Sequence, residues 1–301
     1  MNRAIRAIMV GTMAAATWSA AGAQEPDRPA TLRHAEWIGR VREMTVTGTF
    51  KASDGTELPY RLFRSAAARE NEGTARWPLI LCLHAAGGRG TDNMGHLRGS
   101  QAFLFFAQES MQEKFPCFLV APQCPDGRRW VATPWKKGSY SVDALAMTPE
   151  LACADELVDW ICRTEPVDPD RLYLAGQSMG GFGVFDLLVR RPEKYAAAII
   201  SCGAADPSKA AILREVPLWF FHGEDDATVP YAASVELDAA LRAVGGARHR
   251  FTTFAGVGHT AYENTFEVEG LAEWLFAQRR NAPRRDTSAP VAPIAGADER
   301  P

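Results

Sequence analysis

Residues 172–181 read LYLAGQSMGG, and this stretch decides the fold of the chain. Leu172–Ala175 is a run of strand-forming residues, Gly176–Gly180 has the pattern Gly-x-Ser-x-Gly, and an amphipathic helical pattern follows. The stretch therefore predicts a strand, a tight turn and a helix, with Ser178 at the tip of the turn. In such a turn the N-terminus of the helix lies near the serine hydroxyl, where negative charge develops during nucleophilic attack.

The pentapeptide alone is weak evidence, because common residues produce it by chance in roughly one of ten chains of this length. The alternative interpretation is a Gly-rich turn whose serine only caps the following helix. The position of the pentapeptide between an apolar strand and an amphipathic helix favours a nucleophile.

Strand-like and helix-like stretches alternate from residue 79 onward. Two further strand-like stretches precede them and are joined at Asp54-Gly55, a dipeptide typical of β-hairpins. We therefore expect a single α/β domain over residues 41–280, with the α/β-hydrolase fold: a mostly parallel central sheet, helices on both faces and an N-terminal antiparallel hairpin. Residues 24–40 are expected to be a loose lead-in, and the Pro- and Ala-rich residues 281–301 a disordered tail.

The first 23 residues have the features of a secretory signal peptide. Arg3 and Arg6 precede an apolar run from residue 7 to 16, and Ala21-Gly22-Ala23 fits the rule for the cleavage site. The run is too short, and its side chains too small, for a membrane anchor. We therefore expect export to the periplasm or the medium, without stable membrane insertion after cleavage.

Composition excludes several other classes of protein. The net charge of −3 and the lack of a basic patch argue against a nucleic-acid partner. No Cys/His spacing is typical of a zinc site, so we expect no metal and no organic cofactor. An oxidising compartment leaves both a disulfide and free buried thiols open for the six cysteines: Cys82, Cys117, Cys124, Cys153, Cys162 and Cys202. The oligomeric state is not predicted.

A serine nucleophile needs a base and an acid that orients it. His259 lies in the Gly-rich loop after the last predicted strand and is the expected base, although a surface-loop histidine is the alternative. Asp226 follows the preceding strand and is the expected acid; Asp225 and Asp206 are alternatives. The chain order serine, aspartate, histidine is that of α/β hydrolases.

Acyl transfer also needs hydrogen-bond donors for the oxyanion. The N–H of Met179, directly after the serine, and the N–H of Ala86, in the Gly-rich loop after the first buried strand, are the candidates. The long loop 122–147 carries Trp130 and Trp135, which we expect to bind substrate by stacking. The alternative is that both tryptophans pack and stiffen the loop.

Two further histidines, His84 and His222, stand at the ends of predicted strands. A histidine in such a position is more often a structural partner of the following loop than a base. We therefore expect these two histidines to be structural.

As a set, these motifs resemble the α/β-hydrolase superfamily, and within it the exported esterases grouped as predicted peptidases, phospholipase/carboxylesterases or poly(hydroxyalkanoate)-depolymerase-like proteins. The resemblance covers about residues 41–280 and is carried by LHAAGGRGTDN (83–93), APQCP (121–125), DPDRLY (168–173), GQSMGG (176–181) and HGEDDATVP (222–230). It implies that Asp226 is the acid and His259 the base. Ala85 departs from the family pattern, which has glycine there, and alanine would be strained if that position required a positive φ.

The residues and the resemblance together predict a secreted serine hydrolase that cleaves small-molecule or polymeric carboxylic esters through an acyl-enzyme. Acylated carbohydrates and aromatic esters are the candidate substrates. A serine peptidase on the same fold is the alternative, because it needs the same three residues. A catalytically silent binding protein with this fold is the third hypothesis, and the presence of all three residues argues against it.

Overall fold

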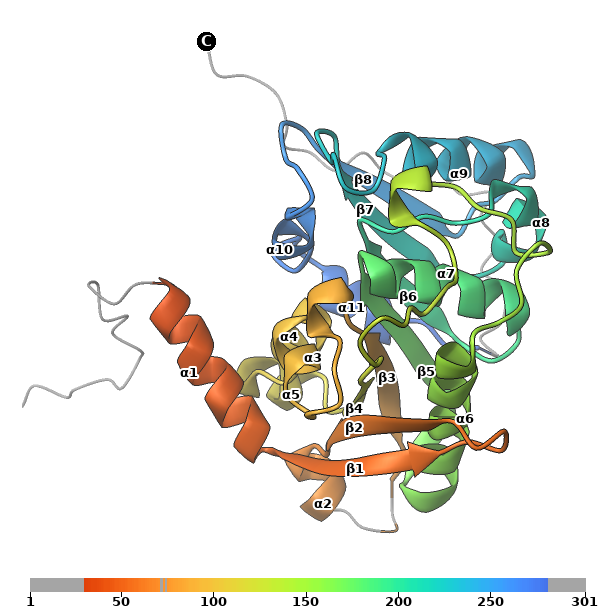
Figure 1. Ribbon diagram of the computed structural model, residues 1–301. Helices are drawn as coiled ribbons and strands as arrows, with labels where there is room; N and C mark the ends of the chain where they lie inside the picture. The colour runs from red at the N-terminus through yellow and green to blue at the C-terminus, as the bar shows by residue number, and fades with distance from the viewer. Residues whose placement is uncertain (1–29, 71–72, 74, 281–301) are drawn as a thin grey trace, which may run out of the picture.

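The computed structural model describes residues 30–70, 73 and 75–280, so the expected signal peptide and C-terminal tail lie outside the described residues. An eight-stranded sheet forms the centre, in the order β1-β2-β4-β3-β5-β6-β7-β8 (Figure 1). β1 pairs with β2, and β2 with β4, in antiparallel fashion, whereas all other pairs are parallel. The strands are β1 (Thr45–Lys51), β2 (Glu57–Phe63), β3 (Trp77–Leu83), β4 (Phe118–Pro122), β5 (Val167–Gln177), β6 (Ala197–Ser201), β7 (Leu218–Gly223) and β8 (His249–Phe254).

Helices cover both faces of the sheet, and each face has its own apolar core (Figure 1). Neighbouring strand residues such as Leu81 and Cys82 belong to opposite cores, as expected for a strand buried on both faces. The predicted fold, with its N-terminal hairpin, is therefore confirmed. The helices are α1 (Ala30–Glu43), α2 (Ala66–Glu70), α3 (Gly95–Arg98), α4 (Gln101–Phe106), α5 (Glu109–Lys114), α6 (Pro149–Thr164), α7 (Met179–Arg190), α8 (Ala210–Leu213), α9 (Ala232–Ala243), α10 (Ala261–Thr265) and α11 (Leu271–Phe276), with 3₁₀ turns η1 (Ala86–Gly88), η2 (Trp135–Lys137) and η3 (Pro207–Lys209).

Helix α6 shows how local sequence sets an element boundary. The hydroxyl of Thr148 accepts a hydrogen bond from the N–H of Leu151 at 3.2 Å, and Pro149 occupies the first turn, where its missing N–H is not needed. The helix buries one face, which includes Leu157 and Ile161.

One segment differs from the sequence-based expectation. The expectation of a loose lead-in is wrong for its described part, residues 30–40, because these residues belong to helix α1. Val41, on the same helix, is fully buried. The indole N–H of Trp37 donates to the carbonyl of Leu104 at 3.0 Å, so α1 is held by tertiary packing that local sequence does not reveal. Residues 66–76 contain the short helix α2, and the last two helices, α10 and α11, are separated at Gly270, which has a φ of 76°.

All six cysteines lie within the described residues, and all six are free thiols. Burial raises the pKa of Cys117 and of Cys153 to about 12, so these side chains behave as small apolar groups. Among the helices described, none has the length and apolar character that crossing a membrane requires.

His84, at the end of β3, connects three loops. Its Nε2 accepts the N–H of Cys124 at 2.9 Å, its Nδ1 lies 2.7 Å from the carbonyl of Ala85, and its own carbonyl accepts the indole N–H of Trp130 at 3.1 Å. An Nε2 that accepts leaves the proton on Nδ1, so the ring is neutral. Burial, opposed by the Ala85 carbonyl, lowers the pKa of His84 to about 4. The expected structural role of this histidine follows from these contacts.

A neutral His84 makes stability depend on pH. In the unfolded chain His84 gains a proton at about pH 6.5, whereas in the folded protein it stays neutral down to about pH 4. The free energy of unfolding therefore falls as the pH is lowered through this window, by up to about 1.4 kcal/mol per pH unit from this residue. Urea denaturation at several pH values measures the slope. His84→Gln keeps an acceptor for Cys124 but does not titrate, so it should flatten the profile; an equal slope in both proteins would contradict the prediction.

Candidate active site

The turn between β5 and α7 forces Ser178 into a sparsely populated backbone conformation, with φ 52° and ψ −120°. Such a conformation costs about 1–3 kcal/mol and persists only where surrounding contacts impose it. The N–H of Ser178 donates to the carbonyl of Ser201 at 2.8 Å, which anchors the turn to β6. The hydroxyl of Ser178 caps no N–H of α7, so the alternative interpretation as a helix cap is excluded.

The glycines beside the serine permit close backbone contacts. A Cβ on Gly176 would lie 2.5 Å from the carbonyl oxygen of Gly180, and one on Gly180 would lie 1.9 Å from the carbonyl oxygen of Leu83. The first turn of α7 therefore packs directly against the end of β3, and a side chain at either position would separate them.

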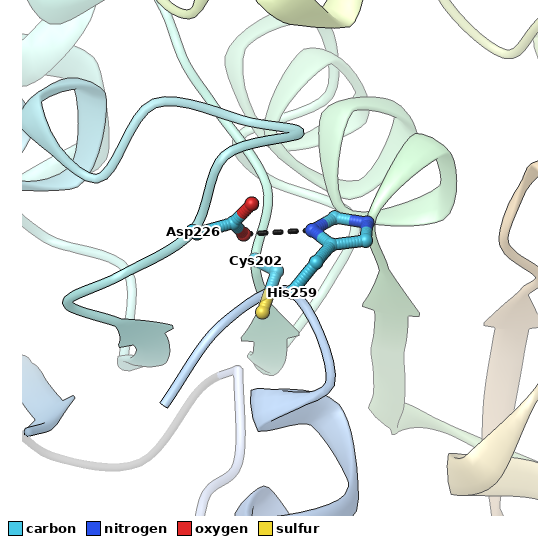
Figure 2. Close-up of side chains that lie close together, drawn as sticks. All are labelled: Cys202, Asp226 and His259. Atoms are coloured by element: carbon cyan, nitrogen blue, oxygen red, sulfur yellow. Dashed lines mark hydrogen bonds and ion pairs between the residues drawn. The ribbon is translucent and has the colours of Figure 1, made fainter. Parts of the chain in front are cut away.

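Ser178, His259 and Asp226 form a hydrogen-bonded chain. Nε2 of His259 lies 2.8 Å from Oγ of Ser178. On the other side of the ring, Nδ1 lies 2.7 Å from Oδ2 of Asp226 (Figure 2). A carboxylate at Nδ1 can only accept, so Nδ1 carries the proton and Nε2 is free to accept the serine hydroxyl. The structure thus brings together the three residues that the sequence predicts as nucleophile, base and acid.

Two loops after neighbouring strands carry the histidine and the aspartate. A Cβ on Gly223, at the end of β7, would lie 2.2 Å from the carbonyl oxygen of Val257, so only glycine lets the His259 loop pack this closely. The N–H of Asp225 donates to the same carbonyl at 3.0 Å. These contacts fix the position of His259 relative to Asp226.

The carboxylate of Asp226 is fully buried, and both of its oxygens have polar partners. Oδ1 accepts the N–H groups of Thr228 and Val229 at 2.8 and 2.9 Å. Oδ2 lies near two imidazoles, Nδ1 of His259 and, at 3.1 Å, Nε2 of His222. Burial acts to raise the pKa of Asp226, but the hydrogen bonds from His222, His259 and Val229 outweigh it and hold the pKa far below its usual value.

The two alternative acids lie elsewhere. Asp225 is exposed to solvent. Asp206 caps η3 and accepts the N–H groups of Ser208 and Val142 at 3.0 and 2.8 Å, which ties the long loop to the end of β6. Of the three candidates, Asp226 is the one hydrogen-bonded to His259.

The two N–H groups that the sequence proposes as oxyanion donors have no acceptor among the described hydrogen bonds. Met179 is the first residue of α7, and its N–H has no intrahelical acceptor. Ala86 opens η1, and within the described part of the chain no hydrogen bond uses its N–H. Ala85 has a φ of −69°, so alanine in place of the family's glycine introduces no strain.

The expected substrate-binding role of Trp130 is wrong. Its side chain is fully buried, its N–H donates to the carbonyl of His84 at 3.1 Å, and its ring meets the His84 imidazole edge-to-face at 5.3 Å. Trp130 packs under the loop, as the alternative interpretation held. Trp135 is half-buried on η2, with the guanidinium of Arg129 4.4 Å from its ring centre. No contact in the described structure links Trp135 to Ser178, so its role at the site stays a prediction.

Cys202 is a neighbour of the site that the sequence did not indicate. It follows β6 with a φ of 50°, and its sulfur lies within 4.8 Å of donor atoms of Asp226 and His259 (Figure 2). The three form a set of potential metal ligands. However, Nδ1 and Oδ2 are only 2.7 Å apart, whereas bonds of about 2.0–2.2 Å from one zinc ion would hold them farther apart. Burial also raises the pKa of Cys202 to about 11, so the side chain is a neutral thiol.

Comparison with known proteins finds similarity to esterases. A family model described as "Putative esterase" matches residues 148–273, which include Ser178, Asp226 and His259. The crystal structure of a thermostable esterase is 31% identical, with a TM-score of 0.71, over 80% of this chain and 64% of that protein. The chain is therefore similar to esterases of the α/β-hydrolase clan. It spans less than two thirds of the length of that thermostable esterase, at 64%.

More distant structures share the fold alone. A ferulic acid esterase is 16% identical, with a TM-score of 0.55, over 77% of this chain and 97% of that one. A "putative dipeptidyl aminopeptidase IV" from Bacteroides ovatus is 17% identical, with a TM-score of 0.51, over 74% of this chain and 35% of that one. No curated protein matches the sequence. Esterases and a peptidase are thus among its neighbours, and fold likeness does not decide between them.

The contact between α7 and β3 can be tested by adding one methyl group. Gly180→Ala places a Cβ against a backbone oxygen that cannot rotate away, so we expect a loss of about 3 kcal/mol or more in the free energy of unfolding. Gly39→Ala is the matched control, because its Cβ would meet nothing within 4 Å in α1, and it should gain about 0.5–1 kcal/mol. Urea denaturation measures both. Equal stabilities would show that the contact does not constrain the turn.

Proposed function

We propose that this protein is an exported serine hydrolase of carboxylic esters. The observation that carries the proposal is the hydrogen-bonded chain from Ser178 through His259 to Asp226, at 2.8 and 2.7 Å. The proposal of export rests on the sequence features of residues 1–23.

In this mechanism Oγ of Ser178 attacks the ester carbonyl while Nε2 of His259 takes its proton. The N–H groups of Met179 and Ala86 stabilise the negative oxygen of the tetrahedral intermediate. The intermediate collapses to an acyl-enzyme when His259 returns the proton to the leaving alcohol. A water molecule, deprotonated by His259, then releases the acid and restores Ser178.

Asp226 keeps its charge throughout this cycle. Its low pKa and four hydrogen-bond donors make it a fixed negative partner for the imidazolium that forms on His259. Transfer of the proton to the aspartate is unnecessary, because the carboxylate stabilises the imidazolium through charge and hydrogen bonding alone.

The substrate is proposed to be a small-molecule or polymeric ester. With Trp130 in the core, Trp135 is the member of the predicted tryptophan pair that is left to bind an aromatic or carbohydrate-linked acyl group. The ferulic acid esterase among the fold neighbours is consistent with an aromatic ester but does not carry the assignment, at 16% identity.

Replacement of the nucleophile tests the proposal directly. Ser178→Ala should lower kcat/KM on p-nitrophenyl acetate and butyrate by at least about a thousandfold, because no other group in the mechanism attacks the carbonyl. Ser139→Ala, on the loop surface, should retain full activity. Methyl ferulate, acetylated xylan and a peptide anilide complete the panel. Turnover of the anilide alone would favour the peptidase; no turnover, or turnover unaffected by Ser178→Ala, would overturn the proposal.

Two adjacent aspartates provide a matched test of the acid. Asp226→Asn should lower kcat by about 10³–10⁴-fold, because the amide cannot hold His259 in the required tautomer or stabilise its charged form. Asp225→Asn makes the same chemical change at the neighbouring residue, which is exposed, and should leave kcat within about twofold of the wild type. Equal losses in the two variants would contradict the assignment of Asp226.

A further inference from the structure

Asp226 binds two histidines, and the proposed mechanism uses only one of them. His222, the penultimate residue of β7, is fully buried, and its Nε2 lies 3.1 Å from Oδ2 of Asp226, the oxygen that also accepts from His259. One carboxylate oxygen therefore lies within about 3 Å of a nitrogen atom of each of the two rings.

The neighbours of His222 determine its protonation. Nε2 faces two groups that can only accept, the Asp226 carboxylate and, at 3.1 Å, the carbonyl of Val229, so Nε2 carries a proton. Nδ1 lies 2.7 Å from the hydroxyl of Ser234, which can donate to it. Ser234 is itself buried at the start of α9, so a neutral ring with Nε2–H has every polar atom satisfied.

The same contacts fix the side chain of Asp226. The N–H groups of Thr228 and Val229 hold Oδ1, and Oδ2 has Nε2 of His222 at 3.1 Å in addition to Nδ1 of His259 at 2.7 Å. A carboxylate held at both oxygens cannot rotate about its last torsion, so Oδ2 stays aligned with Nδ1 of His259.

Other titratable groups surround this pair of imidazoles. From β6 comes the neutral thiol of Cys202, and from α10 the phenol of Tyr262, whose ring centre lies 6.4 Å from that of His259. The ring of Tyr231 lies 5.9 Å from that of His222, edge-on. Glu224 and Asp225 belong to the same loop as Asp226 and are exposed. The side chain in contact with Asp226 from β7 is that of His222.

We propose that His222 is a positioning residue for the reaction of this site: its Nε2–H holds Oδ2 of Asp226 in line with His259 and shares the negative charge of that oxygen. The inference rests on the proposed function. The inference goes beyond the proposed function because it assigns His222 a role in the reaction that acts through Asp226, without contact to substrate.

Loss of this donor has two consequences. The carboxylate gains rotational freedom, so kcat should fall while KM stays unchanged, because His222 does not touch substrate. Oδ2 also directs more negative charge to His259, which favours the imidazolium form. The acid limb of the kcat/KM profile should therefore move to higher pH, a change that a purely structural role would not produce.

His222→Asn and His222→Gln form a matched pair. Asparagine keeps a polar group at the Nδ1 position beside Ser234 but is too short to reach Asp226, whereas the amide nitrogen of glutamine reaches the Nε2 position. On p-nitrophenyl acetate we expect about a tenfold lower kcat, an unchanged KM and an acid limb at higher pH for His222→Asn. His222→Gln should restore both values toward the wild type. Equal behaviour of the two variants would overturn the proposal.

Proton NMR tests the inference without any ester. The proton between Nδ1 of His259 and Asp226 should resonate farther downfield in His222→Asn than in the wild type or His222→Gln, because its carboxylate acceptor becomes stronger. An identical shift in all three would overturn the positioning role. In the wild type, the nitrogen-15 chemical shifts of the His222 ring should show that Nε2 carries a proton. An unprotonated Nε2 would also overturn the positioning role. An inactive wild type that passes these NMR tests would refute the proposed function and retain the positioning of Asp226.

Discussion

The contact between the first turn of α7 and the end of β3 is the constraint on which the site depends. Gly180 lies so close to Leu83 that a Cβ would stand 1.9 Å from its carbonyl oxygen. This approach leaves the chain between β5 and α7 no room for a relaxed turn, which is why Ser178 has a φ of 52°. The same approach places the first turn of α7, which begins at Met179, against the end of β3, from which the loop with Ala86 starts.

A second layer of buried polar groups holds the loops around this turn. Neutral His84 connects the loop after β3 to the loop after β4, because its Nε2 accepts the N–H of Cys124. The indole N–H of Trp130 donates to the carbonyl of His84 and adds a second connection. These groups are removed from water, so each missing hydrogen bond would cost about 1–3 kcal/mol. Rigidity at the site therefore comes from residues that contact neither the nucleophile nor a substrate.

The sequence predicts what depends on local pattern and misses what depends on distant partners. Gly-x-Ser-x-Gly between strand and helix predicts the turn, and the chain order predicts which loops bring Asp226 and His259 to it. Trp130 was misjudged because a tryptophan in a long loop has the same local signature whether it faces a cleft or the carbonyl of His84. Helix α1 was missed because its stability comes from Trp37 and Val41 packing on elements more than 20 residues away, and no local pattern encodes that contact.

Asp226 shows how the fold maintains a buried charge where the proposed chemistry needs one. Removal from water would drive an isolated carboxylate to its neutral form. The carboxylate of Asp226 instead has four polar partners, two backbone N–H groups and two imidazoles. The backbone donors exist because the loop after β7 folds back on its own aspartate, and the donor from His222 exists because that residue is the penultimate one of β7, four residues before the aspartate. The negative charge is thus fixed in place before His259 becomes cationic, so little reorganisation of the protein accompanies the attack of Ser178. Because this arrangement serves an ester and an amide equally, the choice of substrate has to come from groups outside it, and Trp135 and the loop that carries it are the part of the chain where such groups can differ without disturbing the site.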